Sequence, residues 1–139
     1  MLVREIMTRD LETIAPNSSL HAAARMMRRR NIGFLPVVDG NDVVGVLTDR
    51  DIVIRGLCDG RDPRFFTVRD AMSRAPIWCY EDDVLTEAAR LLEESHIRRL
   101  LVLDYDRKLV GLVSMDDLAL NMSSDRLLGV MVRNITAAA

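Results

Sequence analysis

The chain has 139 residues, of which 49% are hydrophobic and 29% are charged, and its formal net charge is −2. This length suits one domain, or two small halves that share a core. The small net charge argues against a general polyanion binder, and the lack of an apolar run of about 20 residues argues against a membrane span. Because the first residues carry early charges and no apolar leader, a cytoplasmic protein is expected.

The first half of the chain predicts one α+β unit. A short extended segment is expected at residues 13–14, and a helix begins after Ser18 as its N-cap. The spacing of four apolar residues predicts the buried face of that helix: Leu20, Ala23, Ala24 and Met27. Strands are expected at 34–39 and 43–48, because these apolar runs flank a short turn sequence. A short helix at 50–57 completes the unit.

The second half repeats the first. The stretch VREIMT at Val3 matches VRDAMS at Val68, and VVGVLTDRDI later matches LVGLVSMDDL. The second copy therefore predicts an extended segment at 78–79, a helix capped by Asp83, strands at 100–104 and 109–114, and a short helix at 116–122. The expected buried face of its first helix is Leu85, Ala88, Ala89 and Leu92.

The order strand–helix–strand–strand–helix in each copy predicts an α+β fold with two βαββα repeats packed about a pseudo-twofold axis. The expected boundaries are 1–61 for the first repeat, 62–122 for the second and 123–139 for a helical tail. In this tail Leu127, Leu128, Met131 and Ile135 share one helical face. We expect that face to pack against the module or across a dimer, to which Phe65 and Phe66 could contribute.

Each copy places a hydroxyl residue three positions before an aspartate where its last strand meets the short helix. The pairs are Thr48 with Asp51 and Ser114 with Asp117. One interpretation is a capping box, which satisfies free backbone donors at a helix start. The other is a ligand site, because a carboxylate accepts two hydrogen bonds and can hold a ribose diol beside free helix amides. Both roles are compatible in one residue.

The two copies resemble a tandem pair of cystathionine-β-synthase (CBS) domains, also called a Bateman module. The resemblance rests on the series VREIMT, TIAP, LHAAARMM, NIGFLPVVD and VVGVLTDRDI, and on its second copy, from Val3 to Leu120. It implies a stand-alone regulatory or sensor module that binds an adenine nucleotide in the cleft between the repeats. It also implies a homodimer, no catalytic activity, no required cofactor and no metal.

The resemblance assigns the site residue by residue. The ribose contacts fall on Thr48, Asp51, Ser114 and Asp117. The adenine side falls on Ile14, Ile32, Gly33, Phe34, Leu35 and Pro36. The phosphate contacts fall on Arg50, His96, Arg98 and Arg99, because a planar guanidinium binds phosphate in a bidentate manner. The second copy departs from the pattern, since arginines stand where the first copy has Gly33 and Phe34, so one nucleotide per chain is expected before two.

Several alternatives remain open. The module could be a ligand-independent dimerisation unit, or a sensor of S-adenosylmethionine or NAD. The two cysteines, Cys58 and Cys79, lack metal-ligand spacing and are expected to be free thiols, although a redox-responsive pair is the third hypothesis. The arginine run at 25–30 is expected to be a solvated helix end rather than a nucleic-acid site. The regulated protein, if there is one, is unknown.

Overall fold

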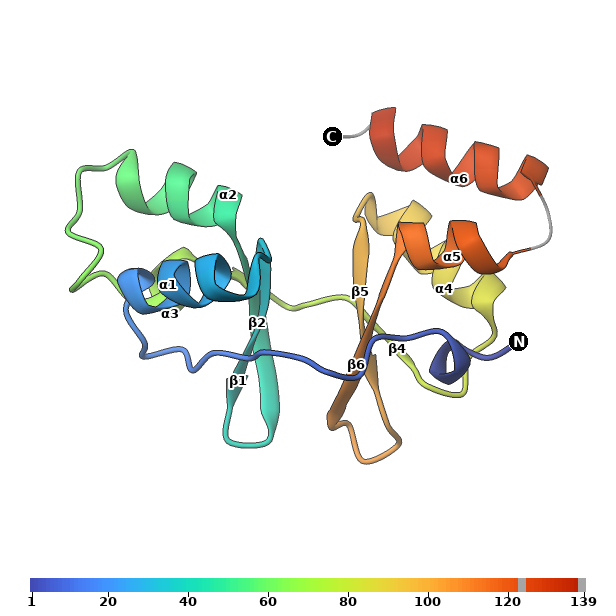
Figure 1. The fold of residues 1–139 in the computed structure, drawn as a ribbon, viewed down its shortest axis with the longest axis horizontal. Helices are drawn as coiled ribbons and strands as arrows, with labels where there is room; N and C mark the ends of the chain where they lie inside the picture. The colour runs from blue at the N-terminus through green and yellow to red at the C-terminus, as the bar shows by residue number, and fades with distance from the viewer. Residues whose placement is uncertain (123–124, 138–139) are drawn as a thin grey trace. The chain divides into compact units, whose positions relative to one another are not determined.

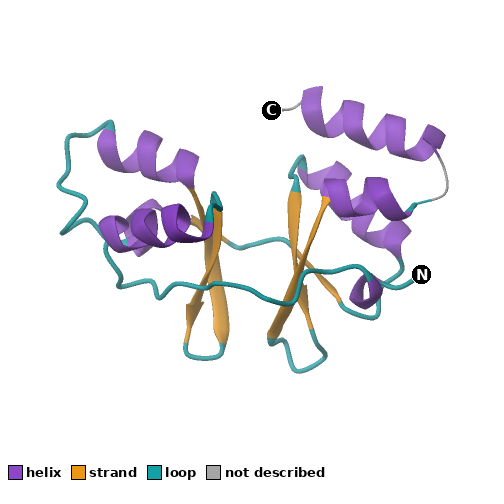
Figure 2. Ribbon diagram, in the orientation of Figure 1, coloured by secondary structure: helices purple, strands orange, loops and turns teal. Residues whose placement is uncertain are grey.

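The computed structural model of the protein describes residues 1–122 and 125–137, except the side chains of 125–128, 131 and 137. It divides into two compact units. The first unit is Glu12–Pro76, and the second unit combines Met1–Leu11 with Ile77–Ala139. Helices and strands are mixed within each unit (Figures 1 and 2), which confirms the predicted α+β class.

The first unit is built on a three-stranded antiparallel sheet in the order β1–β2–β3. Ile14 adds a parallel bridge to Val37 at the other side of β1. The helices lie on one face of the sheet (Figure 1). The elements are α1 (Leu20–Arg30), β1 (Phe34–Asp39), β2 (Asp42–Thr48), α2 (Asp49–Asp51), which continues into the π-helix η2 (Ile52–Leu57), then α3 (Val68–Ala71) and β3 (Ser73–Arg74).

The second unit has a mixed sheet in the order β4–β5–β6, with β4 parallel to β5 and β6 antiparallel to it. Its elements are η1 (Val3–Glu5), β4 (Trp78–Tyr80), α4 (Leu85–Ser95), β5 (Arg99–Leu103), β6 (Leu109–Ser114), α5 (Met115–Asn121) and α6 (Asp125–Ala137). The C-terminal helix is therefore present as expected. Thus both units repeat one plan, and the second unit adds α6 after α5.

Each unit contains the leading segment of the other repeat. In the second unit Thr8 exchanges two backbone hydrogen bonds with Leu112, at 2.8 and 3.0 Å. In the first unit the equivalent residue, Ser73, lies in β3 and pairs with Val46 of β2. The sequence repeat did not predict this exchange, because it aligns the leading segments with their own repeats and says nothing of which sheet they join.

Glycines on β2 and β6 make this exchange possible. A Cβ on Gly45 would lie 2.6 Å from the backbone oxygen of Ser73, and a Cβ on Gly111 would lie 2.6 Å from the sulfur of Met7. Real side chains almost never approach so closely, so an added Cβ would displace the backbone of the leading segment at Gly45 and the Met7 side chain at Gly111. The two positions are equivalent in the two repeats.

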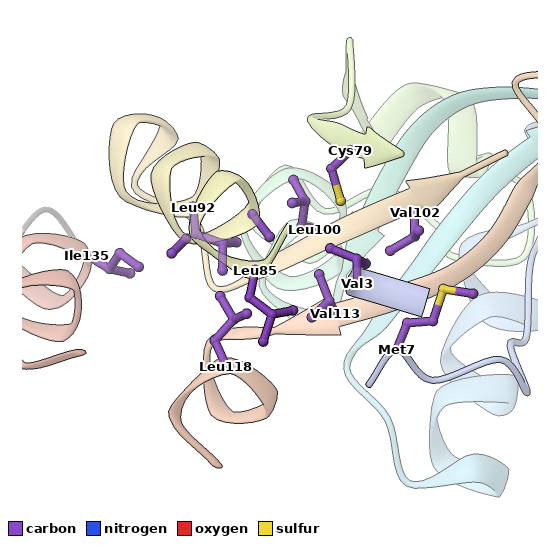
Figure 3. Packing of buried hydrophobic residues seen from close by; sticks show 12 residues of the cluster. Val3, Met7, Cys79, Leu85, Leu92, Leu100, Val102, Val113, Leu118 and Ile135 are labelled. Atoms are coloured by element: carbon purple, nitrogen blue, oxygen red, sulfur yellow. The ribbon is translucent and has the colours of Figure 1, made fainter. Parts of the chain in front are cut away.

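Each unit has its own hydrophobic core. In the second unit Val3 of the leading segment, Leu92 of α4 and Ile135 of α6 all point into one cluster (Figure 3). Ile135 is only 1% exposed. The prediction that the tail packs against the module is thus confirmed for Ile135, whereas the predicted Leu127, Leu128 and Met131 side chains lie outside the described residues.

Two details of the helix predictions were wrong. The N-cap of α1 is Ser19, whose Oγ accepts from Ala22 N–H at 3.0 Å, rather than Ser18. The N-cap position of α4 is Val84, while Asp83 accepts a hydrogen bond from Tyr80 N–H instead. In both units a bridge to the other repeat's leading segment, Ser19 to Thr67 and Val84 to Leu2, fixes where the helix begins.

One predicted core residue was also wrong. Ala24 of α1 is exposed, whereas its equivalent on α4, Ala89, is 4% exposed. The reason is the covering helix: α6 packs against α4, and among the described residues no corresponding helix packs on α1. The other predicted face residues of both helices are buried.

Candidate functional site

The first junction lies at the end of β2, where Thr48 is the N-cap of α2. Its backbone N–H donates to Asp51 Oδ2 at 2.9 Å, and Asp51 N–H donates to Thr48 Oγ1 at 3.1 Å. This is a complete capping box, so the structural interpretation of the motif is confirmed. The Asp51 side chain is 14% exposed, and its Oδ1 lies 4.0 Å from the Arg55 guanidinium.

The second junction repeats this geometry at the end of β6. Ser114 N–H donates to Asp117 Oδ2 at 2.8 Å, and Asp117 N–H donates to Ser114 Oγ at 3.1 Å. The Ser114 hydroxyl lies 2.9 Å from the same carboxylate oxygen. In both boxes the cap occupies Oδ2. The boxes do not use Oδ1 of either carboxylate, and Oδ1 of Asp51 lies near Arg55.

The chain contains a third box of the same type, which serves as an internal comparison. At the start of α3, Thr67 N–H donates to Asp70 Oδ2 at 3.3 Å, and the Thr67 hydroxyl lies 2.8 Å from that oxygen. This pair follows a loop rather than a strand. A hydroxyl–x–x–Asp box is therefore no proof of a ligand site by itself, and the surroundings have to decide.

Beside the first junction lies the entry of β1. Phe34 is paired with Thr48 in the sheet, and the carbonyl oxygen of Gly33 accepts from Asp49 N–H at 3.0 Å. Ile32 is 37% exposed. Leu35 and Ile14, by contrast, are core residues with exposures of 0% and 5%. Their side chains are therefore not available to a ligand, which leaves only their backbone atoms and the residues next to them.

Pro36 is buried on β1, and its missing N–H causes no loss of pairing with β2. Its carbonyl oxygen accepts from Ile14 N–H at 3.0 Å, which shows that this residue's polar groups face the Ile14 side of the strand. Val38 N–H then donates to the Ile14 oxygen at 2.9 Å. The proline therefore stands at the edge of the β1–β2–β3 sheet, as its restricted backbone requires.

Beside the second junction lies the entry of β5. Arg99 is paired with Ser114, and the carbonyl oxygen of Arg98 accepts from Met115 N–H at 2.9 Å. Both arginines are exposed. His96 is exposed too and ends α4 with a left-handed backbone at φ 53°, as Asn31 ends α1 at φ 52°. Strand pairing thus places Phe34 opposite Thr48 and Arg99 opposite Ser114, although the members of each pair lie far apart in sequence.

The two junctions differ in charge. In the first unit the carboxylate of Asp49 fills the space beside Gly33, since a Cβ there would lie 2.7 Å from Asp49 Oδ2. The same carboxylate accepts from the backbone N–H of Arg50 at 2.9 Å, and the Arg50 side chain is exposed. In the second unit the equivalent pair is Arg98 and Met115. Asp49 was not among the predicted site residues. Its signal is nevertheless visible in the sequence, because the first repeat has Gly33 and Asp49 where the second has Arg98 and Met115.

The other candidate chemistries find little in the structure. Cys79 is 2% exposed, and burial, with help from the carboxylates of Asp83 and Glu87, raises the pKa of its thiol to about 12. Cys58 is exposed, and both cysteines are free. Over the described part of the chain no group of three acidic, histidine or cysteine side chains is arranged to hold a metal ion. Within residues 1–122 and 125–137, no helix combines the length and apolar character that crossing a bilayer requires.

The repeated α+β units with their equivalent junctions define a tandem-repeat module, and comparison with known proteins identifies its family. The CBS domain model matches residues 3–56 and again residues 68–124. The chain therefore belongs to the CBS domain family and carries a tandem pair. It is 36% identical over 134 residues to the CBS domain-containing protein YhcV of Bacillus subtilis. The aligned region covers 96% of this chain and 94% of that protein.

Two similar solved structures contain adenosyl compounds. CBSX2 in complex with AMP is 30% identical with a TM-score of 0.72, covering 85% of this chain and 93% of that one. The CBS domain pair of protein MJ0100 in complex with 5-methylthioadenosine and S-adenosyl-L-methionine is 29% identical with a TM-score of 0.75, covering 94% of this chain and 97% of that one. Ligands of this class are thus bound by proteins with this fold.

Proposed function

We propose that this CBS pair is a non-catalytic regulatory module that binds an adenine nucleotide, with Thr48–Asp51 and Ser114–Asp117 as the ribose-binding pairs. The observation that carries the proposal is the position of these two boxes. Each lies hydrogen-bonded beside the entry of a neighbouring strand, with Phe34 opposite Thr48 and Arg99 opposite Ser114. The Thr67–Asp70 box has the same chemistry but no such strand beside it.

The charge difference between the junctions supports a division of labour. The carboxylate of Asp49 beside Gly33 repels a phosphate, so the first junction suits the neutral adenosine part of a ligand. Arg98 and Arg99 at the second junction suit phosphate, because guanidinium groups make charge-assisted hydrogen bonds to its oxygens. AMP, ADP and ATP are therefore the first ligands to test, with S-adenosylmethionine and NAD as the alternatives.

The test is a thermal-shift panel of AMP, ADP, ATP, NAD and S-adenosylmethionine. A ligand at a hundred times its dissociation constant stabilises the folded state by about 2.7 kcal/mol. For a chain of this size that free energy raises the melting temperature by several degrees. Asp51→Ala and Asp117→Ala are each expected to reduce or abolish the shift, since each removes a proposed ribose acceptor.

Asp70→Ala is the matched control. It removes a box of the same type, costs about 1 kcal/mol of stability as the loss of a helix cap, and leaves the ligand shift intact. Equal ligand shifts in the three variants would contradict the ribose assignment. A panel in which no adenosyl compound raises the melting temperature would contradict the proposal as a whole.

A second candidate function is a ligand-independent dimerisation module. The complete capping boxes favour it, because both motifs have a structural role without a ligand. So do the exposed apolar side chains of η2, where Val53, Ile54 and Leu57 are each more than half exposed. This alternative predicts a stable homodimer and no response to the ligand panel.

The proposed regulation works through a homodimer in the cytoplasm. A ligand changes an equilibrium only if it binds one arrangement of the protein more tightly than another. The exposed apolar faces support the homodimer, and the two free cysteines support a reducing compartment. Sedimentation velocity with and without the best ligand measures whether binding alters the assembly.

A further inference from the structure

The tryptophan and both tyrosines of the chain form one cluster in the second unit. The rings of Trp78 and Tyr80 on β4 make an edge-to-face contact, with their centroids 5.0 Å apart. Tyr80 in turn stacks on Tyr105 of the β5–β6 turn, with a centroid distance of 5.1 Å. The sequence has only one tryptophan, two tyrosines and three phenylalanines, so half of its aromatic residues meet here. We call Trp78, Tyr80 and Tyr105 the aromatic cluster.

The cluster lies outside the hydrophobic core. Successive side chains of a strand point to opposite faces of the sheet, and Cys79, which stands between Trp78 and Tyr80, is a core residue at 2% exposure. Trp78 and Tyr80 therefore lie on the face of β4 that points away from the core. Tyr105 is 72% exposed, so one of the three rings is largely open to solvent.

The cluster is also separate from the second junction. Tyr80 is aligned with Leu103 at the end of β5 that leads into the turn, whereas Ser114 pairs with the opposite end of β5. Figure 1 shows the β5–β6 turn at one end of the sheet and the start of α5 at the other. A molecule bound at Tyr105 is therefore distinct from a nucleotide bound at Ser114.

The repeat folds without these rings. At the positions equivalent to Trp78 and Tyr80, the first unit has Thr13 and Ala15, on either side of the residue that bridges to β1. Its hairpin turn, residues 39–42, contains no aromatic residue. The architecture of the repeat therefore does not account for the cluster. Tryptophan and tyrosine that reach the surface without such a need are enriched at sites of protein recognition.

A guanidinium group already lies on the cluster. The Cζ atom of Arg107 is 5.4 Å from the centroid of the Trp78 ring, within the range of a cation–π contact. Arg107 has a left-handed backbone at φ 62°, and the first hairpin turn has its left-handed residue at a glycine, Gly40, at φ 63°. The turn conformation therefore does not call for an arginine. Its side chain shows that the tryptophan face accepts a guanidinium.

The surroundings of the cluster are acidic. The second unit has thirteen acidic and nine basic residues in its sequence. The two segments that bear the rings, residues 78–83 and 104–108, contain five carboxylates and two cations. Of these carboxylates Asp82 is paired with Arg4, and Asp106 is exposed. A surface of this charge attracts cationic groups and disfavours polyanions such as nucleic acids.

We propose that the aromatic cluster is a docking surface for an arginine-bearing extended segment of a partner protein. The rings pack on one another, with 29° between the planes of Tyr80 and Tyr105, so they form a platform rather than a cage around a small ammonium ion. A planar guanidinium stacks flat on such rings and pairs with carboxylates beside them. A partner arginine on Trp78 takes the place of Arg107, and another uses the exposed face of Tyr105. This surface does not depend on the proposed nucleotide site.

The test is a calorimetric titration of the full-length chain with an acetylated and amidated heptapeptide in which arginine alternates with glycine. Trp78 is the only tryptophan, so its fluorescence reports whether the peptide contacts the cluster. The same peptide with citrulline, which keeps the shape of arginine without its charge, is expected to bind about fivefold more weakly or worse. Equal binding of the two peptides, or no binding of the arginine peptide at about 5 mM, overturns the proposal.

Variants locate the contact. Tyr105→Ala is expected to raise the dissociation constant of the arginine peptide about fivefold or more, whereas Tyr105→Phe keeps the ring and is expected to preserve it. Asp106→Lys is expected to weaken binding as well, because it places a cation beside the cluster. Circular dichroism of each variant checks that it is folded. A folded Tyr105→Ala variant that binds the peptide as wild type does overturns the proposal.

The first unit offers matched controls. Phe65 is 78% exposed and also has an arginine over its ring, with Arg64 Cζ at 5.5 Å, but it lies outside the cluster. Phe65→Ala is therefore expected to leave the dissociation constant unchanged. Asp59→Lys makes the same charge change as Asp106→Lys at another exposed position and is expected to be neutral too. Losses in these controls equal to those at Tyr105 and Asp106 overturn the assignment to the cluster.

Further outcomes distinguish other partners. Arg107→Gly removes the resident cation and is expected to keep or strengthen peptide binding, whereas a loss would make Arg107 the recognition residue and overturn a cationic partner. A cluster that binds single-stranded DNA or an oligosaccharide in place of the arginine peptide also overturns the proposal. The thermal shift with an adenosyl ligand is expected to be the same in Tyr105→Ala as in wild type. Failure of that shift in both proteins bears on the proposed function alone.

Discussion

The two units solve the same backbone problems with the same residues and differ where the chain meets solvent. Both have a hydroxyl–Asp box at the end of β2 or β6, a glycine under the crossing segment and a left-handed residue at the end of α1 or α4. They differ at Gly33 and Arg98, at Arg28 and Glu93, and in the presence of α6. The shared positions maintain the fold, and the differing ones give each unit its own charge and surface.

The strongest prediction concerns α6, the helix that distinguishes the second unit from the first. Ile135→Ala removes a side chain that is 1% exposed in the core of the second unit, and it is expected to cost about 2–4 kcal/mol. Hydrogen exchange should rise in α4 and the β4–β5–β6 sheet and stay unchanged in the first unit. Val132→Ala on the same helix, at 37% exposure, is the control and is expected to change stability by less than about 0.5 kcal/mol. Equal exchange in both units would show that they unfold together.

A second prediction concerns Gly45 and Gly111, the glycines where the leading segments cross β2 and β6. In Gly45→Ala the new Cβ meets the backbone oxygen of Ser73 at 2.6 Å, so the leading segment has to move. In Gly111→Ala the nearest atom is the flexible end of Met7, and the Thr8 oxygen lies at 3.1 Å. We expect a loss of about 1–3 kcal/mol for Gly45→Ala and a smaller loss for Gly111→Ala, measured by urea denaturation.

Gly129→Ala provides the control for this pair. Its Cβ would meet nothing within 4 Å on α6, so it is expected to be neutral or to stabilise the helix by about 0.5–1 kcal/mol. A larger loss for Gly111→Ala than for Gly45→Ala would contradict the view that backbone contact decides the cost.

The smallest expected effect near neutral pH concerns the cysteines, one in each unit. Burial raises the pKa of the Cys79 thiol from 9.0 to about 12, so the folded state holds this proton more tightly than the unfolded state. Its contribution to stability is complete below about pH 9 and is lost as the pH rises from there to about 12. At pH 8 a thiol reagent should label Cys58 rapidly and Cys79 only after denaturation.

Cys58→Ser is the control for that labelling, since it removes the exposed thiol and should abolish the fast phase. Rapid labelling of Cys79 in the folded protein would contradict its burial. An oxidant that changes the thermal stability of the Cys58→Ser variant would revive the redox-responsive hypothesis.

Much of the fold could be predicted from the sequence because its signals are local. Apolar runs and the turn residues between them identified the strands around Gly40, and apolar spacing identified α1 and α4. The junction pairs Thr48–Asp51 and Ser114–Asp117 were found because a capping motif is contained within four residues. The helix starts were misplaced by one residue because bridges from the distant residues Thr67 and Leu2 set them.

The repeat, the α+β plan, the family and the pairs of residues at each junction could all be predicted from the amino-acid sequence. Three features emerged from the folded structure: each leading segment joins the other repeat's sheet, Ala89 is buried on α4 whereas Ala24 is exposed on α1, and Asp49 fills the space beside Gly33. The difference follows from the separation along the chain over which each kind of interaction acts. Hydrogen-bonding motifs and hydrophobic periodicity act between near neighbours in the chain, whereas burial and electrostatic surroundings are set by segments that meet only after folding.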